Sequence, residues 1–299
     1  MRAIADFIMR GRMQATLVVA ISAVMPLLFW LGAAAGSLVL LRRGFQDAKS
    51  VLALGLLPAL AWWLLGSDHD PRALLVLLGS ATLAQVLRSS ESWIRVLLVS
   101  IALGLVYAVV LGAVFRPHIE VMSQGLSKVL PMALGDFYQQ MPVEERARLD
   151  ALMPLLLTGM IAAMLQIVSL SCLILGRYWQ AMLYNPGGFG REFRTVRIPR
   201  GLALMLLACM VVGPNIGNQL AMLTPLCSVP LAFAGLALIH ALVAEKHLAR
   251  FWLVGLYVTL LVLINLIYPL LVVLAIVDSL IDFRGRLAPK GPDNANGEG

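Results

Sequence analysis

The sequence predicts an all-α protein, a polytopic bundle of about 8–10 transmembrane segments with short or broken helices at both ends. Apolar residues make up 60% of the 299 residues and charged residues only 13%, whereas soluble domains carry about 25% charged residues. The mean hydropathy is +0.88, and a soluble fold of this size could not bury so much apolar surface. Long apolar runs between short polar stretches therefore indicate helices in lipid.

The chain opens with a short amphipathic stretch at residues 1–13, which we expect to lie on the membrane surface. Apolar runs that we expect to cross the membrane follow at 14–41, 50–65, 73–87, 94–115, 151–176, 201–212, 220–243 and 251–281. We therefore expect one transmembrane domain over residues 1–286. The Pro/Gly/Asn-rich residues 287–299 are predicted to form a disordered cytoplasmic tail.

A long polar segment of mixed charge at residues 116–150 separates two of these runs. Pro142, followed by Glu144 and Glu145, predicts a helix start near its end, because a proline and acidic residues suit a helix N-terminus.

The runs at 14–41 and 251–281 contain Pro26 and Pro269, so each forms either one long tilted helix or two short helices. Half of either run falls short of a hydrocarbon core of about 30 Å, so length alone favours eight single spans. Charge favours ten segments, because most of the 23 Lys and Arg residues then share the cytoplasmic side with both termini. With eight spans the cations divide almost equally. We therefore expect breaks near both prolines.

The longest Arg-rich interruption covers residues 177–200 and carries five arginines against one acid, Glu192. Cationic loops stay in the cytoplasm, which fixes the direction of every other segment. Topology alone explains this loop; alternatively, Arg191, Arg194 and Arg197 contact anionic lipid or a cytoplasmic partner protein.

Ser100 and three small residues recur every fourth position on one predicted helix. Such a stripe permits close approach of another helix, either within the chain or from a partner protein. The small residues are Gly104, Ala108 and Gly112.

Two uncharged polar interruptions are candidates for a solute site, because interrupted helices expose backbone groups and amides to substrates in transporters. Both would lie on the outer side in the ten-segment arrangement and could meet in one pocket. The alternative for the first is an ordinary turn between two helices, and a similar structural role is the alternative for the second. The candidate residues are Asn215, Asn218, Gln219, Asn265 and Tyr268.

Ionisable residues in the apolar runs are few. Asp278 and Asp282, one turn apart, form either a proton or cation relay or an acid pair neutralised by the arginines that follow. His240 is interpreted as an interfacial or hydrogen-bonded residue.

The sequence contains no catalytic motif, no Cys/His spacing typical of a metal site and no phosphate-loop pattern, so neither an enzyme nor a cofactor is expected. A net charge of +7 would suggest nucleic acid in a soluble protein. Loop arginines that set topology account for it here, and the expected partner is the lipid bilayer.

Two stretches, RRGFQDA at 42–48 and VDSLIDFR at 277–284, resemble the YybS-like family of uncharacterised bacterial inner-membrane proteins. The layout is similar across roughly residues 10–286. That family is distantly similar to the substrate-binding subunits of energy-coupling-factor vitamin transporters. The resemblance implies a small helical bundle in the bacterial inner membrane that captures a solute on the outer side and docks on a separate energising complex.

Two functions are consistent with these observations. The first is a solute-binding or transporter-like subunit without its own ATPase. The alternative is a structural or assembly factor that works through lipid or protein contacts. A closed polar cavity under the outer loops would favour the first, because a transporter needs such a cavity and a scaffold does not.

Overall fold

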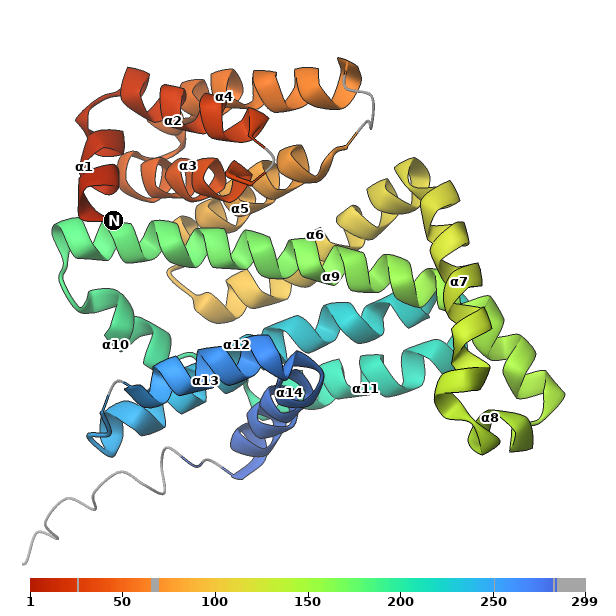
Figure 1. Ribbon diagram of the computed structural model, residues 1–299. Helices are drawn as coiled ribbons and strands as arrows, with labels where there is room; N and C mark the ends of the chain where they lie inside the picture. The colour runs from red at the N-terminus through yellow and green to blue at the C-terminus, as the bar shows by residue number, and fades with distance from the viewer. Residues whose placement is uncertain (26, 66–69, 250, 282, 284–299) are drawn as a thin grey trace, which may run out of the picture. The chain divides into compact units, whose positions relative to one another are not determined.

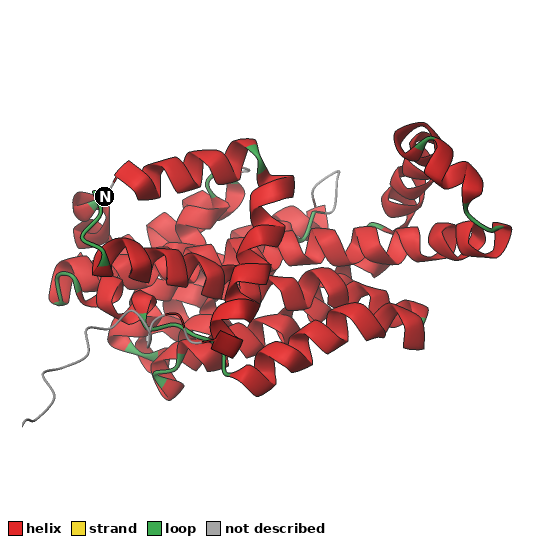
Figure 2. Ribbon diagram, turned by 90° about the horizontal axis from the view of Figure 1, so that it is seen from below, coloured by secondary structure: helices red, strands yellow, loops and turns green. Residues whose placement is uncertain are grey.

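The computed structural model describes residues 1–25, 27–65, 70–249, 251–281 and 283. These residues form fourteen α-helices and one short 3₁₀-helix, and no strand is present among them. Figure 2 shows helices joined by short loops throughout this part of the chain. The predicted all-α class is confirmed.

Six helices in the described part of the chain are long and apolar enough to cross a membrane, which makes this a multi-pass membrane protein. They are α4 (Phe45–Leu65), α5 (Arg72–Ser90), α6 (Trp93–Val114), α9 (Val143–Tyr184), the continuous stretch of η1 and α12 (Asn218–Glu245) and α14 (Ile264–Ile281). Three shorter apolar helices accompany them: α2 (Arg12–Val24), α11 (Arg200–Ile216) and α13 (Phe251–Val262).

The chain groups into two compact units. Unit 1 comprises Met1–Glu192 and Met205–Pro230; unit 2 comprises Phe193–Leu204 and Leu231–Gly299. Each unit is described by itself, and the single transmembrane domain over residues 1–286 stays a prediction. The predicted tail at 287–299 lies outside the described residues.

The first predicted break is confirmed. Helix α2 ends at Val24 and α3 (Phe29–Arg43) begins five residues later, although Pro26 itself lies outside the described residues. The two helices pack closely where a Cβ added at Gly32 would meet the Ser22 hydroxyl and the Val19 carbonyl oxygen. The amphipathic α1 (Arg2–Arg10) packs on both helices and buries Ala5 and Ile8.

Helix α9 is the central element of unit 1 and contacts α3, α5, α6 and α7 (Arg116–Leu134) (Figure 1). Its 42 residues span about 63 Å at 1.5 Å per residue, so it is longer than the hydrocarbon core. It begins directly after Pro142 with Glu144 and Glu145 in its first turn, as predicted. The loop expected to begin at residue 177 is wrong in its first part: the helix continues through Arg177 to Tyr184, and Trp179 is fully buried in the core.

The polar segment at residues 116–150 is largely helical. It forms α7, the short α8 (Asp136–Gln140) and the first turns of α9. Helix α7 buries Ile119 and Ser123 and crosses α9 near the N-terminal end of that helix (Figure 1).

A proline inside a helix leaves the carbonyl four residues before it without its usual N–H partner, and at two such positions in unit 1 a side chain of another element takes the place of that partner. Pro214 frees the carbonyl of Met210, which accepts a hydrogen bond from Thr224 Oγ1 at 2.9 Å. Pro230 frees the carbonyl of Leu226, to which Gln166 Nε2 donates at 3.4 Å. Side chains of neighbouring helices thus satisfy backbone groups that lipid cannot satisfy.

In unit 2 the predicted break near Pro269 is displaced. Helix α13 ends at Val262 and α14 begins at Ile264, so the break falls at Leu263 and Pro269 lies inside α14. A proline disturbs the helix on its N-terminal side, where it removes the bond to the fourth residue before it. The interruption therefore precedes the proline by more than a turn.

Candidate functional site

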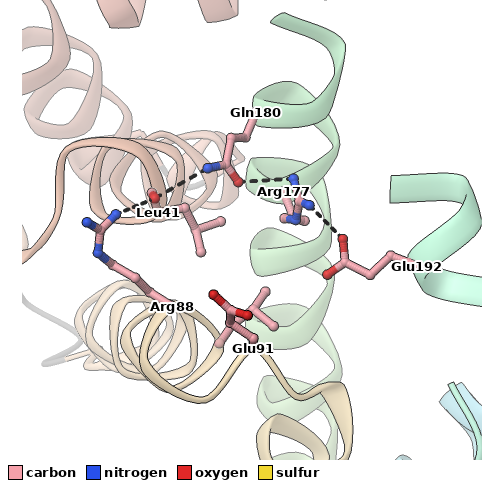
Figure 3. A pocket seen from close by; sticks show the side chains of 7 residues that line it. Leu41, Arg88, Glu91, Arg177, Gln180 and Glu192 are labelled. Carbon is pink, nitrogen blue, oxygen red and sulfur yellow. Dashed lines mark hydrogen bonds and ion pairs between the residues drawn. The ribbon is translucent and has the colours of Figure 1, made fainter. Parts of the chain in front are cut away.

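A polar cavity of about 570 Å³ lies in unit 1, where the ends of several helices meet (Figure 3). Helix α3 contributes its C-terminal end, α5 its last turn and C-cap, α9 its last turns, and α10 (Gly188–Arg194) one side chain. The lining residues are Leu41, Leu87, Arg88, Glu91, Arg177, Gln180 and Glu192.

The C-terminal end of α3 forms one side of the cavity. The carbonyl oxygen of Leu41 accepts hydrogen bonds from Arg88 Nη1 at 2.6 Å and from Gln180 Nε2 at 3.3 Å. The last carbonyls of a helix lack partners within the helix and carry partial negative charge, which a guanidinium compensates well. Gly44, with φ +86°, leaves room for this group: an added Cβ would lie 3.1 Å from Arg88 Nη2.

An ion pair forms the opposite side. Arg177 Nη2 donates to Glu192 Oε2 at 2.6 Å and Arg177 Nη1 donates to Gln180 Oε1 at 3.1 Å. The other oxygen of Glu192 accepts a hydrogen bond from Trp93 Nε1 at 2.7 Å. Both side chains of the pair are mostly buried, with 19% and 28% exposure. Arg177 and Glu192 therefore hold α10 on α9 and α6.

Glu91, unlike Glu192, has a carboxylate without a partner among the described residues. Its carboxylate lies between Arg88 and Arg177 in Figure 3, and it has no hydrogen bond or ion pair within the described part of the chain. Arg88 uses only Nη1 on the carbonyls of Leu40 and Leu41. The cavity thus presents one carboxylate and part of one guanidinium that are open to a ligand.

This arrangement is suited to binding a charged or polar molecule. Ligand pockets usually have volumes of about 300–1,000 Å³, and the cavity falls in this range. Among the described residues, no group of three or more His, Cys, Asp or Glu side chains is close enough to hold a metal ion.

No family model, curated protein or solved structure matches this chain. The family resemblance of residues 42–48 and 277–284 therefore stays a prediction.

The structure divides the predicted solute site between the two units. Asn215, Asn218 and Gln219 are exposed in unit 1, at the end of α11 and in η1 (Asn218–Met222). Arg148 Nη2 donates to Asn215 Oδ1 at 2.9 Å, so this amide connects α11 to the start of α9. Asn265, exposed, and Tyr268, half-buried, lie on α14 in unit 2. Their role in binding stays a prediction.

The arginine loop has contacts within unit 2. Arg197 Nη2 donates to the carbonyl of Asp278 at 2.9 Å, and Arg200 Nε donates to the carbonyl of Ser279 at 3.2 Å. These arginines compensate the negative C-terminal end of α14. Arg197 also lies 3.9 Å from the Asp278 carboxylate, which is 3% exposed. This geometry favours the neutralised-acid interpretation of Asp278; Asp282 lies outside the described residues.

Arg191 and Arg194, with Arg197, were predicted to contact lipid or a partner. Arg191 is exposed in unit 1, while Arg194 is half-buried in unit 2. His240 in the same unit forms a hydrogen bond with the Tyr257 hydroxyl at 2.8 Å, in agreement with its interpretation as a hydrogen-bonded residue.

The small-residue stripe on α6 is occupied from within the chain. A Cβ at Gly104 would lie 2.6 Å from Leu226 Cδ2 and 2.9 Å from Gln166 Oε1. Ala108 is also buried, and Gly112 faces Thr158. Gly104 and Ala108 are thus buried within the chain, which agrees with intramolecular packing of the stripe and leaves neither residue accessible to a partner protein.

Glu91, Arg88 and Gln180 were not predicted to form a site. Arg88 was interpreted as a topology-setting cation, and Gln180 lay in a stretch interpreted as loop. The left-handed backbone at Glu91 has no sequence signal, because glycine is the usual residue in that conformation.

Proposed function

We propose that this multi-pass membrane protein is a solute-binding, transporter-like subunit without its own ATPase, and that the cavity of unit 1 receives a small hydrophilic ligand. The carrying observation is the cavity itself, with its open carboxylate and guanidinium. Arg177 and Glu192 are mostly buried and pair with each other. Arg88 and Glu91 are exposed residues at the rim of the cavity, and their guanidinium and carboxylate atoms that are unpaired in the described part of the chain are free to contact a ligand.

The cavity belongs to the cytoplasmic end of the protein in the proposed topology. Arg42 and Arg43 follow directly after Leu41 at the end of α3, and α10 carries Arg191 and Arg194. Such cationic segments stay on the cytoplasmic side. The ligand would then exchange with the cytoplasm, not with the outer side that the family resemblance implies.

An energising partner is part of this proposal, because the sequence has no phosphate-loop pattern. We propose the bacterial inner membrane as its location, where the cationic ends of α3 and α10 would be available to anionic lipid and to a cytoplasmic partner protein.

The test is thermal unfolding of the detergent-purified full chain in the presence of small charged solutes. A ligand at about 100 times its Kd stabilises the folded state by about 2.7 kcal/mol, which corresponds to a rise in Tm of about 5–10 °C. We expect at least one amino acid, phosphate ester or organic cation to produce such a rise. If none does, the structural or assembly role is the better account.

A further inference from the structure

The backbone of Glu91 has a conformation that a glutamate adopts at a cost. Glu91 is the C-cap of α5 with φ +51° and ψ +21°, in the left-handed region. Glycine is the usual residue at this position because it has no Cβ to crowd the following carbonyl. The backbone therefore does not explain why a glutamate is present. Strained residues of this kind are concentrated at functional sites.

The side chain supplies a reason. The two oxygens of Glu192 in the same cavity accept hydrogen bonds from Arg177 and Trp93. The carboxylate of Glu91 enters the cavity with no such donor in the described part of the chain (Figure 3). A carboxylate accepts hydrogen bonds only, so its natural complement is a cationic donor such as an ammonium group.

Arg88 supplies the opposite charge one turn earlier on the same helix. Its Nη1 is held by the α3 carbonyls at 2.6 and 3.4 Å, which fixes the guanidinium. No bond of its Nε or Nη2 is present in the described region, so these donors can reach an anionic oxygen. A guanidinium suits carboxylate and phosphate groups because of its planar fork.

We infer that the cavity of unit 1 takes a zwitterion, whose ammonium group binds Glu91 and whose phosphate or carboxylate binds Arg88. This inference rests on the proposed ligand-binding function. The two arginines and two glutamates of the lining balance each other. A simple anion would meet the like charge of Glu91, and a simple cation would meet Arg88, whereas a zwitterion complements both.

Two sources offer this chemistry in a membrane. One is a free zwitterionic solute, and the other is the ethanolamine phosphate headgroup of a lipid. Phosphoethanolamine is therefore the probe, with inorganic phosphate and ethanolamine as its two halves. Binding to the detergent-purified full chain is measured by calorimetry at constant ionic strength.

We expect phosphoethanolamine to bind about tenfold or more tightly than either half, which corresponds to one additional charge-assisted contact. The substitution Glu91→Gln should remove this preference and leave phosphate affinity unchanged or improved. Phosphate binding as tight as phosphoethanolamine binding, with no effect of Glu91→Gln, would overturn the zwitterion and leave the proposed function standing. No binding by any of the three probes would overturn the zwitterion site, whereas the proposed function is overturned only if the wider screen of charged solutes also finds no ligand.

Glu91→Gly separates binding from folding, and the chain offers a matched control. His247 is the other non-glycine residue with positive φ in the described chain, also at +51°, and it lies outside the cavity. Both glycine substitutions should raise Tm, because both relieve the left-handed strain. Only Glu91→Gly should lose the preference for phosphoethanolamine. Equal retention of that preference in both variants would contradict the inference.

Reconstitution distinguishes the two sources. In nanodiscs of phosphatidylethanolamine, a lipid headgroup in the cavity would block soluble phosphoethanolamine, whereas nanodiscs of phosphatidylglycerol would leave it accessible. Blocked binding assigns the site to lipid, and equal binding in both assigns it to a free solute. Either result supports a zwitterion site, provided that in detergent the Glu91→Gln variant no longer binds phosphoethanolamine more tightly than phosphate.

Discussion

Gly176 of α9 packs directly against the backbone of α3. Its substitution offers a quantitative test of the packing of unit 1. A Cβ added there would lie 2.9 Å from the Ala34 carbonyl oxygen, 2.9 Å from Ser37 Cβ and 3.1 Å from Leu38 N. These atoms belong to the backbone of α3 or are attached to it directly, so no flexible side chain can move aside. Helix α3 itself must shift by about 0.5 Å to restore ordinary contact distances.

The expected cost follows from two opposing effects. Overpacking of this kind costs about 1–3 kcal/mol, and the higher helix propensity of alanine offsets up to about 1 kcal/mol. Gly176→Ala should therefore lower the free energy of unfolding by about 1–2 kcal/mol and Tm by about 2–6 °C. The matched control is Gly112→Ala on α6, where the nearest atom, Thr158 Cγ2, would be 3.9 Å away. This control should be neutral or stabilising.

Differential scanning fluorimetry of both variants in the same detergent measures the difference. Both variants carry the same glycine-to-alanine substitution in a transmembrane helix of the same chain. The effect of the detergent on Tm therefore cancels when the two variants are compared. A Gly176→Ala protein that is as stable as Gly112→Ala would refute the close packing of α3 against α9.

Two further predictions concern topology and the arginine loop. Reporter fusions at Gln140 should indicate the outer side and fusions at Gly188 the cytoplasm; the same side for both would refute the single crossing of α9. Arg197→Gln removes a donor from the C-terminal end of α14 and should destabilise the protein by about 1–2 kcal/mol, measured as a lower Tm. Arg191→Gln, at an exposed position, should leave Tm within about 1 °C, and equal effects of the two would contradict the capping role of Arg197.

The membrane character of the fold could be predicted because lipid imposes it on composition. Apolar runs such as 94–115 coincide with helices because backbone groups in lipid must be satisfied within one segment. The break between α2 and α3 was also predicted, from Pro26 and the distribution of cationic residues. Helix ends were less predictable: Arg177 was interpreted as the start of a loop, but burial of Trp179 extends α9 to Tyr184.

The polar cavity could not be predicted, for reasons that lie in its geometry. Leu41 contributes a backbone carbonyl, whose availability depends on where α3 ends. Arg88, Glu91 and Glu192 come from segments up to about a hundred residues apart, and cations at such positions fit the topology rule equally well. The left-handed backbone of Glu91 is a tertiary feature. Sequence reasoning instead favoured the amides around Asn215, of which one is engaged by Arg148.

The central claim is that the cavity of unit 1, and not general surface charge, binds the ligand. Calorimetric titration of phosphoethanolamine into Arg88→Gln and Arg95→Gln proteins tests it most directly. Both substitutions remove one arginine from the same predicted cytoplasmic side, but only Arg88 lines the cavity, whereas Arg95 is exposed on the first turn of α6. We predict that Arg88→Gln weakens binding by about tenfold or more and that Arg95→Gln changes it by less than about twofold. Equal losses in both variants, or tight binding retained in Arg88→Gln, would contradict the claim.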